Sequence, residues 1–136
     1  MDYTNLIRKA LEARSHSYSP YSHFAVGAAL LCADGTVYQG ANIENAAFGV
    51  SQCAERTALF QAVFEGKREF TAIAIVGKAE GAEPKLCAPC GICRQALTEF
   101  CSPEDFEIVL AVTEENYKIY KLAELLPLGF TNESLH

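Results

Sequence analysis

Hydrophobic and polar positions along the chain alternate between helical and strand periods. Residues 3–15 place apolar side chains three and four positions apart, which predicts an amphipathic helix. Apolar runs at 26–32 and 37–41 flank an Asp-Gly pair and predict two strands joined by a hairpin turn. Residues 42–52 have no clean period and are interpreted as a loop.

The second half of the chain continues this alternation of helices and strands. Residues 53–65 keep one apolar face and stop at Gly66, as expected for a helix, and residues 72–76 form a strand that is apolar on both faces. The remaining predicted elements are a loop at 77–89, a helix at 91–100, strands at 106–112 and 118–121, and a helical turn at 123–126. This order predicts one α/β domain over residues 1–136, a three-layer α-β-α sandwich.

Composition and charge restrict the partners of such a domain. Half of the 136 residues are apolar and the net charge is −6, which argues against nucleic acid but not against a small nucleoside. Residues 2–16 mix charges with apolar residues, unlike a secretory signal, and the apolar run 24–33 is too short to cross a bilayer. We therefore predict a cytoplasmic protein with no membrane partner.

Six cysteines are the most informative residues of the chain. Cys32 and Cys101 lie in apolar patterns and are predicted to be buried small hydrophobes. Cys90 and Cys93 are three positions apart at the start of a predicted helix, so both sulfurs can reach one ion. Cys53 begins another predicted helix, and two helix N-termini aimed at one point would favour thiolates there.

Three thiolates from Cys53, Cys90 and Cys93 would leave the fourth position of a tetrahedral zinc ion open, as in catalytic sites. Glu55 lies two residues after Cys53, close to that position without being a ligand. A ligand two residues before a glutamate, followed by Pro-Cys-x-x-Cys, is the general signature of zinc nucleobase deaminases. The sequence thus predicts one Zn²⁺ per chain, with Glu55 as the proton carrier.

Cys87 provides an alternative, because four cysteines could close a structural zinc site. Ala88 precedes Pro89 and is therefore expected to be extended, which separates the α-carbons of Cys87 and Cys90 by about 10 Å. A closed site would also leave the spacing of Glu55 unexplained. We predict that Cys87 is not a ligand, and a non-enzymatic zinc-binding module using four cysteines remains the alternative.

Three thiolates on one Zn²⁺ carry a net charge of −1, which makes acidification of a bound water harder. Arg56 follows Glu55, while Arg94 and Gln95 follow Cys93, all within first helical turns. We predict that these three side chains form hydrogen bonds to the thiolates and draw charge from the metal.

Five motifs occur in the order found in the small homotetrameric cytidine deaminases, and the chain resembles that family from about residue 6 to 130. They are PYSHFAVGAAL at 20–30, GANIENAA at 40–47, CAERTA at 53–58, PCGICRQ at 89–95 and LLPLGF at 125–130. The resemblance implies a mixed five-stranded sheet and a homotetramer. It also implies hydrolysis of cytidine and 2′-deoxycytidine to uridine and 2′-deoxyuridine with release of ammonia, a step of pyrimidine salvage.

The same resemblance implies a role for each matched position of the pocket. Asn42 and Glu44 would bind the ribose hydroxyls, which amide and carboxylate groups can do. Phe24 would pack against the pyrimidine, and backbone groups around Ala54 would face the base. Phe130 would reach the pocket of a neighbouring subunit and stack there.

Residues 46–48 would lie at subunit contacts, so that each pocket is shared. Ala46 and Ala47 match the family, whereas Phe48 stands where the family usually has tyrosine, and the hydroxyl contact of that tyrosine would be lost. A deaminase of another small aminopyrimidine remains a second alternative. A polynucleotide deaminase is less favoured, for want of a basic strand-binding face.

Overall fold

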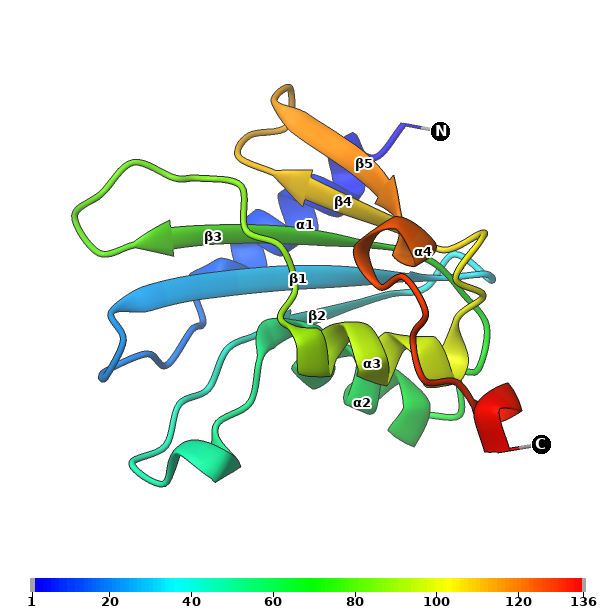
Figure 1. Ribbon diagram of the computed structural model, residues 1–136. Coiled ribbons are helices and arrows are strands. Elements are labelled where there is room, and N and C mark those ends of the chain that lie inside the picture. The colour runs from blue at the N-terminus through cyan, green and yellow to red at the C-terminus, as the bar shows by residue number, and fades with distance from the viewer. Residues whose placement is uncertain (1, 136) are drawn as a thin grey trace.

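The computed structural model describes residues 2–135, so Met1 and His136, the ends of the predicted domain, lie outside it. The helices are α1 (Thr4–Arg14), α2 (Ala54–Phe64), α3 (Gly91–Phe100) and α4 (Leu122–Leu125), with short 3-10 turns at Phe48–Val50 and Asn132–Leu135 (Figure 1). The strands are β1 (Phe24–Cys32), β2 (Val37–Ala41), β3 (Phe70–Ala79), β4 (Glu107–Ala111) and β5 (Tyr117–Lys121). This order of elements confirms the predicted order.

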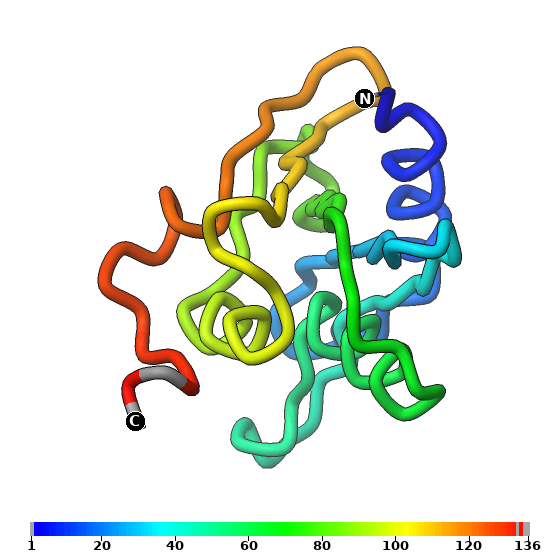
Figure 2. Tube along the Cα trace, turned by 90° about the vertical axis from the view of Figure 1, so that its right-hand side faces the viewer, coloured from blue at the N-terminus to red at the C-terminus, as the bar shows by residue number. Residues whose placement is uncertain are grey.

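The five strands form one mixed sheet, as the resemblance implies, and their order in it is β2-β1-β3-β4-β5. Strands β3 and β4 are parallel, whereas the other neighbouring pairs are antiparallel. A parallel pair needs a long crossover, and α3 supplies it. Viewed along the strands, α1 lies on one side of the sheet and α2 and α3 on the other (Figure 2). The three-layer α-β-α sandwich is therefore confirmed.

Alternation along the two central strands separates two hydrophobic cores. Leu30 and Ile75 belong to the core beneath α2 and α3, whereas Ala29 and Val76 belong to the core beneath α1. Successive residues of a strand point to opposite faces of the sheet. Neighbouring residues at the ends of β1 and β3 therefore face different surroundings, and this separates two cavities described below.

Both central strands are longer than the apolar pattern predicts. Strand β1 begins at Phe24, and β3 extends to Ala79, three residues into the predicted loop 77–89. The two strands pair antiparallel from Phe24 opposite Ala79 to Cys32 opposite Phe70, so backbone pairing carries β3 beyond its apolar run. Hydrophobicity alone could not reveal this extension, because Lys78 is polar.

Local signals at other positions behave as expected. Gly66 has a φ of +94° just after α2, the left-handed conformation that ends helices. Cys32 and Cys101 are buried, as predicted. Among residues 2–135, we find no helix with the length and apolar character needed to span a bilayer.

Gly40 allows strand β2 to approach α2, the helix that carries Glu55. A Cβ atom at Gly40 would lie 2.4 Å from the carbonyl oxygen of Ala54 and 2.5 Å from the backbone nitrogen of Ala58. Both atoms belong to the backbone of α2, which cannot move aside as a flexible side chain can. The position of α2 over the sheet therefore depends on a residue without a side chain.

We predict that Gly40→Ala lowers the free energy of unfolding by about 1–3 kcal/mol, because the added methyl group overpacks the β2–α2 contact. Urea denaturation followed by circular dichroism measures this change. Gly49→Ala is the matched control, since a Cβ atom there meets nothing within 4 Å. Equal unfolding midpoints for the two variants would contradict the close approach.

Candidate metal centre and adjoining pocket

Three cysteine sulfurs meet where two helices begin. Cys53 is the N-cap of α2, Cys90 is the N-cap of α3, and Cys93 lies in the first turn of α3. Their ligand atoms all lie within 4.8 Å of one another, with Sγ–Sγ distances of 3.7 Å for Cys53–Cys90 and 3.4 Å for Cys90–Cys93. The structure thus brings together the three predicted metal ligands.

The close contact of these sulfurs perturbs the pKa values of Cys53 and Cys93. Hydrogen bonding from the Cys93 thiol, followed by that from Arg56, lowers the pKa of Cys53 to about 5 against the opposing effect of burial. The contact with Cys53, together with burial, raises the pKa of Cys93. The pKa values of Cys53 and Cys93 are thus pushed in opposite directions by their mutual contact, and a cation bound between the sulfurs would favour the thiolate form of each. Three thiolates at this spacing fit zinc, which prefers such donors.

Arg56 contacts the sulfur cluster as predicted, whereas Arg94 and Gln95 do not. The Nη2 atom of Arg56 donates to Cys53 Sγ at 3.5 Å. Arg94 instead donates to the carbonyl oxygens of Pro89 and Leu125, at 2.7 and 2.5 Å. The expectation that Arg94 binds a thiolate is wrong, because these carbonyl groups occupy its guanidinium.

Gln95 is also directed away from the sulfurs. Its Nε2 atom donates to the carbonyl oxygen of Phe130 at 2.8 Å, and its Oε1 atom accepts from the Phe130 backbone nitrogen at 3.1 Å. The predicted hydrogen bond from Gln95 to a thiolate is therefore also wrong. Its paired contacts fix the backbone of the C-terminal segment against α3, which positions the Phe130 region.

Glu55 is a buried carboxyl group at the start of α2. Its exposed fraction is only 5%, and burial raises its pKa to about 7, with the nearby Cys53 thiolate adding to the rise. A carboxyl group with a pKa near neutrality can both accept and release a proton, as a general acid–base group must. The position of Glu55, two residues after Cys53, puts this group beside the sulfurs.

A cavity of about 280 Å³ adjoins the sulfurs and Glu55. The predicted site residues that line it are Phe24, Asn42, Glu44, Cys53, Ala54, Glu55 and Cys90. They come from β1, from the loop after β2, and from the starts of α2 and α3. Residues that the sequence places in separate motifs therefore share one pocket.

Asn42 is held in place by the start of β1, and Glu44 by the chain segment that leads into this strand. The Asn42 side chain donates to the carbonyl oxygen of Phe24 at 2.8 Å and accepts from the Val26 backbone nitrogen at 2.9 Å. Glu44 accepts from the backbone nitrogens of residues 21 and 22 and from the Ser22 hydroxyl, whose hydrogen bond lowers the Glu44 pKa. Glu44 is therefore an ionised acceptor at the pocket.

Cys87 lines the pocket but lies outside the sulfur group. Burial raises its pKa to about 11, so it stays a neutral thiol. A Cβ atom at Gly77 would lie 2.8 Å from Cys87 Cβ and 2.9 Å from Phe24 Cε1, so both side chains pack on the bare backbone of β3. Cys87 therefore stays a predicted non-ligand, and its place in the pocket wall was not foreseen. The short distance in sequence between Cys87 and Cys90 was the feature that could have placed Cys87 in the pocket wall.

Four other residues that line this pocket were not predicted from the sequence. Val26 follows Phe24 on the same face of β1, so strand alternation could have placed it in the pocket. Ser51, Gln52 and Ala88 line the pocket from loops next to Cys53 and Cys90, where no periodic signal exists. Their nearness in sequence to the ligands was the only indication.

The residues expected at subunit contacts are exposed in the single chain. Ala46 and Ala47 are exposed, Phe48 is 80% exposed and Phe130 is 62% exposed. Phe48 lines an apolar hollow beside Glu44, whereas Phe130 is not among the residues lining the cavity of its own chain that adjoins the sulfurs. The structure therefore brings Phe48, but not Phe130, next to the pocket residues.

Comparisons with known proteins agree on one family. Residues 1–109 match the family described as "Cytidine and deoxycytidylate deaminase zinc-binding region". The cytidine deaminase of Halalkalibacterium halodurans is 47% identical over 136 residues, covering 100% of this chain and 99% of that protein. The cytidine deaminase of Sporosarcina psychrophila is 45% identical, covering 99% and 96%. The crystal structure of cytidine deaminase from Burkholderia pseudomallei has a TM-score of 0.85 at 45% identity, covering 96% of this chain and 100% of that one.

We predict that Cys87→Ser keeps one zinc per chain, whereas Cys90→Ser loses it, because only Cys90 belongs to the sulfur group. Each variant is incubated with a chelator and passed through a gel-filtration column, and elemental analysis then measures the zinc that it retains. Both variants replace one sulfur atom by oxygen, at positions three residues apart, so each is the control for the other. Loss of zinc from Cys87→Ser would contradict the assignment.

Proposed function

The chain belongs to the cytidine and deoxycytidylate deaminase family, and from this premise we propose that it hydrolyses cytidine and 2′-deoxycytidine to the corresponding uridines. Cys53, Cys90 and Cys93 hold the zinc, and Glu55 carries the protons. The observation that carries this proposal is a buried carboxyl group beside three clustered thiols in the wall of one cavity. An ordinary structural zinc site has no need for such a carboxyl group.

The reaction adds water to C4 of the base and breaks the bond between C4 and the amino nitrogen. Bound zinc acidifies water and so makes a nucleophile available near neutral pH. Glu55 would accept one proton of the attacking water and deliver it to ring N3. It would then take the second proton from the hydroxyl group now on C4 and pass it to the amino group, which leaves as ammonia as the C4 carbonyl of the uridine forms. Its pKa of about 7 suits a group that must gain and lose a proton repeatedly.

The pocket suits an uncharged nucleoside. Among the described residues that line it there is no lysine or arginine, and Glu44 adds a negative charge. A phosphate group would be repelled there, whereas ribose hydroxyls can donate to the Glu44 carboxylate. Phe24 offers an aromatic surface for the pyrimidine, and the net charge of −6 disfavours a polynucleotide.

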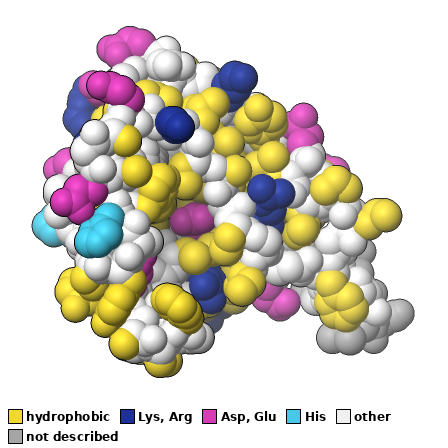
Figure 3. All heavy atoms as spheres, turned by 60° about the vertical axis from the view of Figure 1, so that its left-hand side comes forward, with side chains coloured by type: hydrophobic (Ala, Val, Ile, Leu, Met, Phe, Trp, Pro, Cys, Tyr) yellow, Lys and Arg dark blue, Asp and Glu magenta, His cyan; other side chains and the backbone are white. Residues whose placement is uncertain are grey.

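The active form is a homotetramer in which subunits share their pockets. Figure 3 shows hydrophobic side chains gathered at the lower left of this face of the molecule. Large apolar residues exposed on the loops near the pocket include Tyr21, Ile43, Phe48 and Val50. Apolar surface of this kind, next to a binding site, is typical of a protein interface.

The six cysteines are free thiols in the structure, which supports a location in a reducing compartment, the cytoplasm.

We predict that Glu55→Gln keeps its zinc and loses nearly all turnover of cytidine, at least about 10²–10⁴-fold, because the amide cannot carry protons. Ammonia release measures the rate, and elemental analysis measures the metal. Glu115→Gln, in the exposed turn between β4 and β5, is the matched control and retains full activity. Substantial turnover by Glu55→Gln would exclude this residue as the proton carrier.

We predict that Phe130→Ala lowers kcat/KM about 5-fold to 150-fold, because a stacking contact with the base is lost. If that contact crosses a subunit boundary, mixing Phe130→Ala with Glu55→Gln subunits restores activity. In a random mixture, about a quarter of the pockets combine an intact Glu55 with an intact Phe130 from a neighbour. Activity that stays at the sum of the two separate variants would contradict the shared pocket.

A further inference from the structure

A second cavity of about 350 Å³ lies on the α1 side of the sheet. Its lining includes Arg14 at the end of α1, Ala25 of β1 and Lys78 of β3. Ala25 and Lys78 are paired directly across the two strands. Phe24 and Val26, the neighbours of Ala25, line the pocket on the opposite face. Strand alternation therefore keeps this cavity separate from the proposed substrate site.

Two half-buried cations in this cavity lack partners of their own. Among the side chains that the structure describes, neither Arg14 nor Lys78 has an ion pair or a side-chain hydrogen bond. The Nη1 atom of Arg14 is shielded from water, and burial lowers the Arg14 pKa. Leaving half-buried charged side chains unpaired costs free energy, so an anion in the cavity that accepts hydrogen bonds from Arg14 and Lys78 would be stabilising.

The rim of the cavity is held in a strained conformation. His23 has a φ of 56°, which is uncommon for a residue other than glycine. Its backbone nitrogen donates to Ser19, its carbonyl oxygen accepts from Glu80, and its Nδ1 atom lies 3.0 Å from the Glu80 carboxylate. Glu80 also lines the cavity, but its carboxylate contacts His23 and forms no ion pair with Arg14 or Lys78. Residues held in sparsely populated conformations cluster at binding sites.

We propose that this cavity binds a phosphate group through Arg14 and Lys78. Two unpaired cations match a doubly charged anion, and the guanidinium fork matches the oxygens of phosphate. The hydroxyl group of Ser19 lines the same cavity and can donate a further hydrogen bond. Such a site stands out in a chain with a net charge of −6, and it does not depend on the deaminase reaction.

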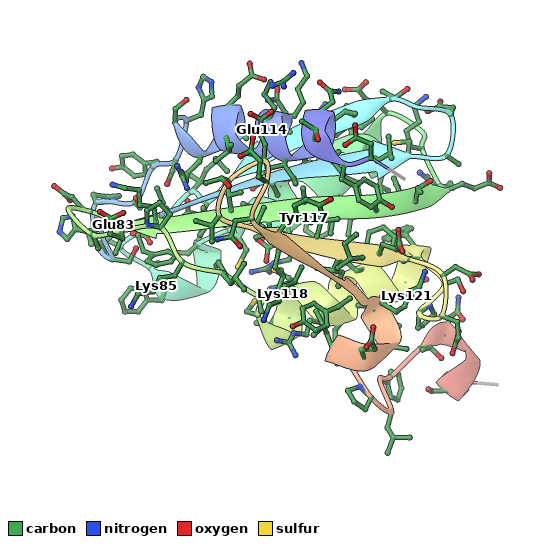
Figure 4. The ribbon with its side chains drawn as sticks, turned by 90° about the horizontal axis from the view of Figure 1, so that it is seen from above. Glu83, Lys85, Glu114, Tyr117, Lys118 and Lys121 are labelled. Carbon is green, nitrogen blue, oxygen red and sulfur yellow. The ribbon has the colours of Figure 1, made fainter. Side chains whose placement is uncertain are left out.

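Isothermal titration calorimetry of the zinc-loaded protein with inorganic phosphate, at constant pH and ionic strength, tests this site. We expect wild-type protein to bind phosphate, and Arg14→Gln and Lys78→Gln each to bind about tenfold more weakly, as expected for the loss of one charged hydrogen bond. Lys118→Gln is the matched control, because Lys118 is an exposed lysine on β5 (Figure 4). Its affinity stays at the wild-type value.

Ribose 5-phosphate distinguishes the source of the phosphate group. Tighter binding than inorganic phosphate assigns the site to a sugar phosphate, whereas equal binding assigns it to free phosphate, and the two variants weaken both. Thermal unfolding verifies that the variants are folded, and Lys78→Gln alone suffices if Arg14→Gln does not fold. Absence of phosphate binding by the wild-type protein, or equal affinity for wild type, Lys78→Gln and Lys118→Gln, would overturn the proposal.

Discussion

The clustering of three cysteine sulfurs at the starts of two helices is the constraint on which the rest of the structure depends. Thiolates at such distances repel one another, and each contributes a negative charge that must be balanced. Two helix N-termini, the guanidinium of Arg56 and a zinc ion supply the opposing charge. The sheet makes this possible, because α2 and α3 lie side by side on one of its faces. Gly40 lets β2 approach the backbone of α2, and Gly77 lets Cys87 and Phe24 pack against β3. The residues of the site are thereby brought close together.

Burial of Glu55 beside this cluster gives the site its chemistry. A carboxyl group near the surface would stay ionised at neutral pH, whereas this one is desolvated and has a raised pKa. Glu44, in the same cavity, has a lowered pKa because it accepts a hydrogen bond from the Ser22 hydroxyl. One cavity thus holds one carboxyl group suited to proton transfer and another suited to accepting hydrogen bonds. Their different surroundings, and not their chemical type, assign the two roles.

Features set by local geometry could be predicted from the sequence. Cys90 and Cys93 meet because they are three positions apart in one helix, and Cys53 caps a helix whose pattern is visible. Contacts between distant segments could not be predicted in this way. Gln95 pairs with Phe130, 35 residues away, and no periodic pattern encodes that choice. The cavity between Arg14 and Lys78 likewise depends on the register of β1 against β3, which sequence alone does not specify.

The most direct test of this account is the absorbance of free cytidine after addition of purified protein, measured before and after removal of the metal by a chelator. We expect conversion to uridine with one ammonia released per cytidine. We also expect loss of that conversion in the chelated protein and its return when zinc is added back. Unchanged cytidine in the presence of the zinc-loaded protein would contradict it, as would full turnover by protein shown to be free of metal.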